Sequence, residues 1–278
     1  MLHRLAFHLL FSLVVVFWVP SFSFAAEVSK AAPSAPPAAE NNPAAHGGEG
    51  VTTQIEDVQY SRVDVFSMNK LMWALGVYNP SSPDDINTFM RVTECPLFQK
   101  FYDDDITWEK IKKSMTNYLN ENRSDVSWRY EYTFPATLGR YDENLSGFPL
   151  IDGTDMLSVK SIEIINFSGN LDQQIPCVKG IYGPLRFPAS VILKTKSPLT
   201  LSFIRVSKAV AGAYLDRLQV EGINGRPVYL RLRFVVSDLE GVKGEDDRDM
   251  IVSVRGRVER VDAFADQELM LPIFGQDF

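Results

Sequence analysis

The amino-acid sequence predicts an α+β fold, in which a helical N-terminal layer is followed by a mostly antiparallel β-sheet with one further helix. Between about residues 60 and 123, apolar residues recur at the three-to-four spacing of amphipathic helices. From Val126 onward the spacing changes to two, and Val, Ile, Tyr and Phe become frequent. Because the helical pattern comes first and the strand pattern follows, the class is α+β.

Residues 1–25 carry the three parts of a secretory signal. Arg4 supplies a positive start, Leu9 to Val19 form an apolar stretch, and Ser23-Phe24-Ala25 places small residues before a cleavage point. The apolar stretch is shorter than the roughly 20 residues that a membrane span needs, although an uncleaved N-terminal anchor is the alternative. We therefore expect an exported protein, periplasmic or secreted, with no membrane span after signal cleavage.

Residues 26–50 form a linker in which Ala and Pro predominate and several glycines follow. The segment has no apolar periodicity, so its burial cannot repay the entropy cost of ordering it, and we expect a disordered tether. This leaves residues 51–278 as a single α+β domain, helical from about 60 to 123 and strand-rich from about 126 to 278. A chain of that length is sufficient for one sizeable core.

Three helices are expected in the first part of this domain. The first covers residues 64–76, and the second starts at Ser82-Pro83-Asp84-Asp85, which combines a cap, a first-turn proline and two acids. The second is interrupted at Cys95-Pro96, since proline cannot continue a helix. The third follows Asp103–Asp105, with Asp105 or Thr107 as the candidate cap. Its expected buried stripe comprises Trp108, Ile111, Met115, Tyr118 and Leu119.

The residue pattern of the strand-rich part predicts a series of strands and one helix. The best two strands come last, at 228–236 and 251–261, and each places its valines, leucines and phenylalanines on one face. One helix is expected over 207–218, with Val210, Ala213, Tyr214 and Leu218 inward. The other expected strands cover residues 128–134, 157–167, 190–196 and 199–206.

Charge and histidine content exclude several function classes. The chain holds 28 Lys+Arg against 35 Asp+Glu, a net charge of −7, which argues against nucleic-acid binding by the whole protein. Its 3 histidines are His3, His8 and His46, so the expected domain has none. Without imidazole there is no Ser-His-Asp or Cys-His hydrolase and no ordinary catalytic zinc site. Neither phosphate-binding nor dinucleotide-binding glycine loops occur, so we expect no cofactor and no metal.

Cys95 and Cys177 are the only 2 cysteines. An even number of cysteines in an exported chain suits one disulfide, which would join the helical part to the strand-rich part. The alternative is two separate buried thiols, because free cysteine often acts as a small core hydrophobe.

Two catalytic arrangements need no histidine and are the alternatives to a binding role. Ser67 and Lys70 fit the S-x-x-K spacing of penicillin-binding enzymes, but the S-D-N and K-T-G elements of those enzymes are absent. Paired carboxylates could hydrolyse a glycosidic bond, although helix capping and turns also explain these acids. The candidate acids are Asp103, Asp104, Asp105, Glu131, Asp152 and Asp155. The acidic stretch 245–249 lacks calcium-loop spacing and fits a hairpin loop better.

Four arginines are the best candidates for binding an anion or a partner. Arg231 and Arg233 alternate on one expected strand, and Arg255 and Arg257 alternate on the next. If the strands pair as a hairpin, all four lie on the face opposite the apolar stripe, where arginine forks can hold phosphate or carboxylate. A charge-balanced lattice with nearby acids is the alternative. The aromatic series Trp128, Tyr130 and Tyr132 could stack on a ligand or belong to the core.

One stretch resembles a known family. The segment 79–111 combines Cys95 after a short helix with Phe101-Tyr102, Asp104-Asp105 and Trp108. In these features it resembles an uncharacterised family of exported bacterial proteins, a domain of unknown function. The resemblance implies a bacterial envelope or secreted setting and supplies no activity.

Together these observations predict a non-enzymatic binding or assembly module of the bacterial envelope. Its expected partner is a protein or an anionic ligand, and nucleic acid is not expected. The alternative is a histidine-free hydrolase that uses paired carboxylates or Ser67 and Lys70.

Overall fold

The computed structural model describes residues 58–167, 175, 177, 185–246 and 248–278. The predicted signal, 1–25, and the predicted linker, 26–50, lie outside these residues, so both stay predictions. The described part begins shortly before the first short strand, β1 (Ser61–Arg62).

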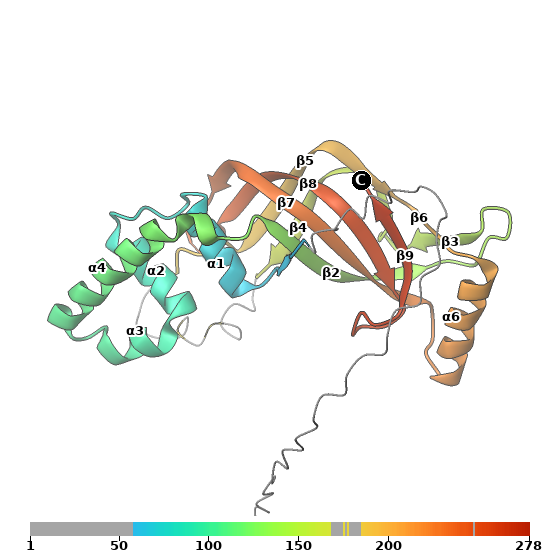
Figure 1. The fold of residues 1–278 in the computed structure, drawn as a ribbon, viewed down its shortest axis with the longest axis horizontal. Helices are drawn as coiled ribbons and strands as arrows, with labels where there is room; N and C mark the ends of the chain where they lie inside the picture. The colour runs from blue at the N-terminus through green and yellow to red at the C-terminus, as the bar shows by residue number, and fades with distance from the viewer. Residues whose placement is uncertain (1–57, 168–174, 176, 178–184, 247) are drawn as a thin grey trace, which may run out of the picture. The chain divides into compact units, whose positions relative to one another are not determined.

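Four α-helices and one 3-10 turn occupy the first part, one α-helix more than predicted (Figure 1). They are α1 (Val65–Ala74), α2 (Pro83–Thr93), α3 (Cys95–Phe101), α4 (Asp105–Glu121) and η1 (Arg123–Asp125). Cys95-Pro96 ends α2 as expected but also opens α3, because a proline in the first turn sacrifices no helical hydrogen bond.

The helix caps follow the sequence closely, with one correction. Asp64 caps α1 through a capping box with Ser67, and Ser82 caps α2. The cap of α4 is Asp104, whose carboxylate accepts the backbone N–H of Thr107 at 3.0 Å, so the prediction of Asp105 or Thr107 was wrong. The expected stripe of α4 also needs correction, since Tyr118 is exposed rather than buried.

In the residues that the structure describes, the second part contains eight strands and one helix, α6 (Lys208–Val220). The strands are β2 (Arg129–Leu138), β3 (Gly147–Ile151), β4 (Met156–Asn166), β5 (Ser190–Leu201), β6 (Phe203–Arg205), β7 (Pro227–Lys243), β8 (Ile251–Phe264) and β9 (Pro272–Asp277). Within α6, Tyr214 and Leu218 are buried as predicted, but Ala211 takes the inward place expected for Val210 and Ala213.

The strands form one sheet in the order β4-β5-β8-β7-β2-β3-β6, with β1 beside β2 and β9 beside β8 (Figure 1). The pairs are antiparallel except β1–β2 and β5–β8, which are parallel. The α+β class with helices mostly before the sheet is therefore confirmed. The two best predicted strands do pair as a long hairpin, β7–β8, whose loop begins at Gly244 with φ +80°.

One hydrophobic core joins the helices to the sheet. On β7, Leu230, Leu232, Phe234 and Val236 are buried as their period predicted, and Val252, Val254 and Val258 of β8 are buried with them. Helix residues such as Met68 and Met90 belong to the same core. Among the described residues, no helix has the length and apolar character that a membrane crossing requires.

Candidate functional site

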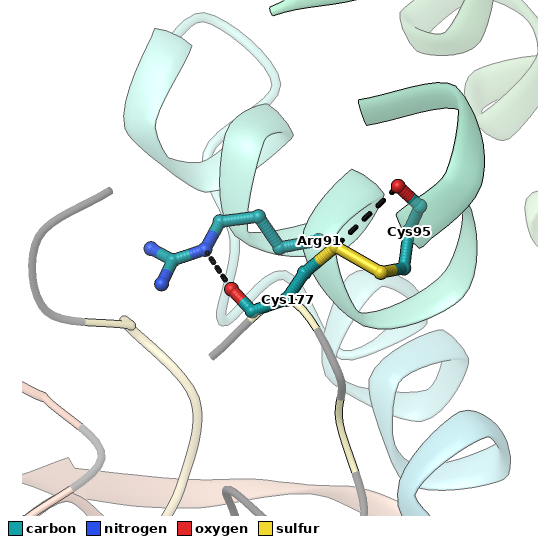
Figure 2. Close-up of a disulfide and its surroundings, with 3 residues drawn as sticks. All are labelled: Arg91, Cys95 and Cys177. Carbon is teal, nitrogen blue, oxygen red and sulfur yellow. Dashed lines mark hydrogen bonds between the residues drawn. A yellow bond between two sulfur atoms is a disulfide. The ribbon is translucent and has the colours of Figure 1, made fainter. Parts of the chain in front are cut away.

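Cys95 and Cys177 form a disulfide, as one of the two sequence alternatives predicted (Figure 2). Their Cα atoms lie 5.7 Å apart, and the bond joins α3 to a position 82 residues further along the chain. Arg91 of α2 lies beside it, and its Nε donates a hydrogen bond to the carbonyl oxygen of Cys177 at 3.2 Å. Both cysteines are buried, which fits a disulfide that stabilises the fold.

Ser67 and Lys70 do not form a nucleophile–base pair. The Ser67 hydroxyl donates to the carbonyl oxygen of Arg62 at 2.7 Å and accepts the backbone N–H of Asp64 at 3.0 Å. No hydrogen bond links it to Lys70 within the described part of the chain. The hydroxyl is engaged in capping α1 rather than held ready for proton transfer.

Two of the candidate carboxylates have side-chain partners, and others lie at a helix start or in a turn. Asp104 caps α4, and hydrogen bonds from Thr107 hold the pKa of its carboxyl below the usual value. Glu131 pairs with arginines of β7. Asp103 and Asp105 are exposed beside the start of α4, and Asp152 occupies a turn with φ +58°. None of these contacts creates a facing pair of carboxylates.

The acidic stretch 245–249 is the loop of the β7–β8 hairpin, as expected. The carboxylate of Asp249 accepts the backbone N–H of Glu245 at 3.0 Å, and Asp246 pairs with Arg248. In the described ranges, no group of three or more His, Cys, Asp or Glu side chains could hold a metal ion.

The aromatic series on β2 faces mainly the core. Tyr130 is 1% exposed, and its ring stacks on Phe234 of β7 with centroids 6.0 Å apart. Burial raises the pKa of the Tyr130 hydroxyl. Tyr132 is half-buried and stacks on Phe134 at 5.7 Å. These contacts fit a core role better than ligand stacking.

The four candidate arginines separate into two pairs along the β7–β8 hairpin. All four lie on the sheet face opposite the buried valines and leucines, as predicted. The register places Arg231 opposite Asp262 and Arg255 opposite Asp238. Because β7 and β8 run antiparallel, the first pair lies toward the open end of the hairpin and the second toward its loop.

Arg231 and Arg233 belong to a partly buried ion-pair lattice. The Nη2 atom of Arg231 lies 3.1 Å from Oδ2 of Asp262, and Nε of Arg233 lies 3.5 Å from Oε2 of Glu131. The guanidinium groups also lie over aromatic rings, Arg231 over Phe264 at 4.6 Å and Arg233 over Tyr60 at 5.2 Å. These two side chains are only 19% and 27% exposed, so the lattice fixes them.

Tyr60 and Glu259 extend this lattice. The Tyr60 hydroxyl donates to Oε2 of Glu259 at 2.7 Å, and Arg129 approaches the same oxygen at 3.3 Å. Burial and the hydrogen bond to Glu259 together raise the pKa of Tyr60. The charge-balanced alternative therefore describes the Arg231–Arg233 half of the hairpin.

Arg255 and Arg257 are much more exposed. Their side chains are 60% and 68% exposed, and each pairs with one carboxylate, Arg255 with Asp238 and Arg257 with Glu259. The Arg255–Asp238 pair is exposed on both sides and contributes about 0–1 kcal/mol, so a partner's carboxylate can replace Asp238 at little cost. Glu259 is only 16% exposed and also holds Tyr60 and Arg129, so Arg257 meets a partner with the part of its guanidinium that Glu259 leaves exposed.

Two lysines of β5 extend this exposed half. Lys194 lies directly opposite Arg255 in the parallel β5–β8 register, and Lys196 follows on the same face of β5. We call Lys194, Lys196, Arg255 and Arg257 the cation face. Lys194 pairs with Glu240 at 3.3 Å, whereas Lys196 has no ion-pair partner among the described residues.

Residues 82–217 match the family model of DUF4852, a domain of unknown function. The resemblance to an uncharacterised family is thereby confirmed. The match is longer than the stretch 79–111 that suggested it, since it runs from the cap of α2 into α6. No curated protein and no solved structure matches the chain.

The DUF4852 match includes both cysteines and the lysines of the cation face, whereas Arg255 and Arg257 lie beyond it. Sequence reasoning missed Lys194 and Lys196 as site residues because the parallel β5–β8 pairing is not visible in either strand alone. The signal available was their period-two spacing, which places both on one face of β5.

Proposed function

We propose that this protein is an exported, non-enzymatic binding or assembly module of the bacterial envelope, which binds an acidic partner protein through the cation face. The export pattern in residues 1–25 and the family resemblance support the setting. The contacts of Arg231 and Arg233 with Glu131 and Asp262 make that pair a scaffold, so the exposed pair, Arg255 and Arg257, carries the binding role.

The observation that carries the proposal is the direct opposition of Lys194 and Arg255 on neighbouring strands. Like charges at opposite positions repel each other, and the exposed pairs of Lys194 with Glu240 and of Arg255 with Asp238 offset this repulsion only weakly. The chain as a whole has a net charge of −7, so four cations on adjacent strands stand against the overall acidic charge of the protein. Clustered cations steer and orient an acidic partner through charge complementarity.

The hydrolase alternative has less support. The Ser67 hydroxyl is engaged at the start of α1, and Glu131 is held by Arg231 and Arg233. A nucleophilic serine needs a base within hydrogen-bond reach, and a catalytic carboxylate must be free to exchange a proton at neutral pH. Neither residue has such surroundings.

Affinity capture with charge-reversed protein tests the proposal. The full chain with Arg255→Glu and Arg257→Glu is compared with wild type, after cross-linking in the native envelope and washing at increasing salt. We expect wild type to retain a partner that the double variant loses, with salt weakening the retention.

The matched control carries Lys110→Glu and Lys113→Glu, which make the same charge change on exposed positions of α4. This control is expected to retain the partner. If the control and the double variant lose the same partner equally, net charge rather than the cation face governs the retention, and the proposal is wrong. Retention by all three proteins also contradicts it.

A further inference from the structure

The sheet has a gap beside the cation face. Along one edge of β8, the parallel pairing with β5 ends at Thr195 opposite Gly256, and the antiparallel pairing with β9 begins at Arg260 opposite Asp277. The register therefore assigns Arg257 and Val258 no partner strand on this edge. Pro198 accounts for the departure of β5, because proline has no N–H to continue a ladder.

A cavity of about 380 Å³ occupies this gap. The alternation of the strands places Leu199 and Val258 toward the core and Lys196 and Arg257 toward the outer face. Because residues of both faces line the same cavity, it leads from the cation face toward the interior. Its size falls within the range of small-molecule sites.

The inner wall of this cavity is apolar. Leu199 and Val258 are 2% and 8% exposed, and Pro198 and Phe278 complete the wall. Phe278 is held in place by its backbone N–H, which donates to the carbonyl oxygen of Glu259 at 3.1 Å, while its side chain remains 46% exposed. Such a wall favours the hydrocarbon part of a ligand.

The mouth of the cavity is cationic. Arg257 lines it with a 68% exposed side chain, and Lys196 lines it without an ion-pair partner among the described residues. An unpaired ammonium and an exposed guanidinium at the entrance to an apolar recess favour a ligand that is anionic at one end and apolar at the other.

From this arrangement we infer that the cavity binds a small carboxylate with an apolar chain. The carboxylate lies between Lys196 and Arg257, and the chain lies against Leu199, Val258 and Phe278. This site goes beyond the proposed function, since it assigns a small-molecule ligand where the proposal assigns a protein partner.

Calorimetric titration of the full chain, expressed with its own export signal and purified, tests the inference with three probes. Octanoate has both features of the ligand, octanamide has the chain without the charge, and acetate has the charge without the chain. We expect octanoate to bind at least about fivefold more tightly than octanamide and acetate not to bind measurably.

Two substitutions test the charge contact and the apolar wall of the cavity separately. Lys196→Gln is expected to weaken octanoate binding about fivefold or more and to leave octanamide unchanged, because only the charge contact is removed. Phe278→Ala is expected to weaken both probes, because it removes part of the apolar wall. Lys160→Gln on β4 is the matched control and is expected to change neither, since Lys160 is exposed on another strand.

The inference is overturned if octanoate does not bind, if octanamide binds equally well, or if Lys196→Gln has no greater effect than Lys160→Gln. Its failure is distinguishable from that of the proposed function. Phe278→Ala changes the cavity without altering the charge of the cation face, so partner capture by this variant reports on the cation face alone.

Discussion

Arg260 donates from Nε to Oδ1 of Asp262, two residues away on the same strand, across 2.6 Å. The Asp262 side chain is only 7% exposed and also meets Arg231 at 3.1 Å. Hydrogen bonds to Asp277 and Asp262 raise the pKa of Arg260 further above its already high value. Asp262 is thus the buried centre of the lattice that holds Arg231 and Arg233.

Removing Asp262 should therefore cost much more stability than removing an exposed partner of the same arginine. We expect Asp262→Ala to lower the free energy of unfolding by about 2–3 kcal/mol, because it removes the buried carboxylate that three partly buried arginines share and leaves Arg231 and Arg233 only the longer contacts with Glu131. Asp277→Ala should cost about 0–1 kcal/mol, since the Asp277 side chain is 79% exposed. Urea titration of both variants measures the difference, and equal losses would contradict the description of Asp262 as a buried centre.

The disulfide should contribute strongly to stability. Replacing both cysteines, Cys95→Ala and Cys177→Ala, opens a loop that spans 82 residues. We expect the free energy of unfolding to fall by about 2–5 kcal/mol, mainly because the unfolded chain gains conformational freedom. Denaturant titration with and without reductant provides the measurement. A wild-type protein whose unfolding midpoint is unchanged by complete reduction would refute this expectation.

Thr195 should be a site where a substitution increases stability. Its Oγ1 atom is buried and has no hydrogen-bond partner in the described part of the chain. Thr195→Val replaces the hydroxyl with a methyl group of similar size, so we expect a gain of about 1 kcal/mol. Thr200→Val, at an exposed position of β5, should change stability by less than about 0.5 kcal/mol. A loss of stability in Thr195→Val, seen by thermal unfolding, would mean that the hydroxyl has a partner.

The protein should lose stability at alkaline pH partly through Tyr214. Burial raises the pKa of Tyr214 to about 12, although nearby Arg226 and Arg217 lower it, and its hydroxyl donates to the carbonyl oxygen of Pro227 at 2.8 Å. Because the folded pKa lies above that of the unfolded chain, the contribution is complete below pH 10 and is lost as pH rises through 12.

The variant Tyr214→Phe isolates this contribution. It should lose some stability at pH 7, where the hydrogen bond is missing, but its stability should fall less steeply between pH 10 and 12. The difference in slope should amount to at most about 2 kcal/mol over that range. Denaturant midpoints measured at several pH values give both quantities, and parallel pH curves for the two proteins would exclude the assigned role.

Local patterns in the sequence predict much of this fold. The stripe that includes Met68 and Leu71 predicts α1, and Ser82-Pro83 predicts the start of α2, because caps and helical periods act over a few residues. The alternation around Leu230 and Leu232 predicts β7 and its buried face for the same reason. What these patterns cannot supply is the partner of each strand, since pairing joins distant residues.

In the candidate site, too, local patterns predict the face on which a residue lies but not its partners on other strands. The face carrying Arg231 and Arg255 follows from alternation, and the structure confirms it. The unequal exposure of these two arginines goes with the carboxylates opposite them, since Asp262 is 7% exposed and Asp238 is 51% exposed, and the register that sets these partners has no local signature. The place of Lys194 beside Arg255 depends on a parallel pair formed across 61 positions, so only the structure reveals the cation face.

If the cation face binds an acidic partner, reversing the charge of its exposed arginines must weaken binding, and the dissociation constant of the captured partner measures that effect. We predict that Arg255→Glu with Arg257→Glu weakens binding at least about tenfold at moderate salt, while the thermal midpoint stays within a few degrees of wild type. The α4 control, Lys110→Glu with Lys113→Glu, should bind like wild type. A double variant that folds and binds with the wild-type constant would show that the cation face does not bind the partner.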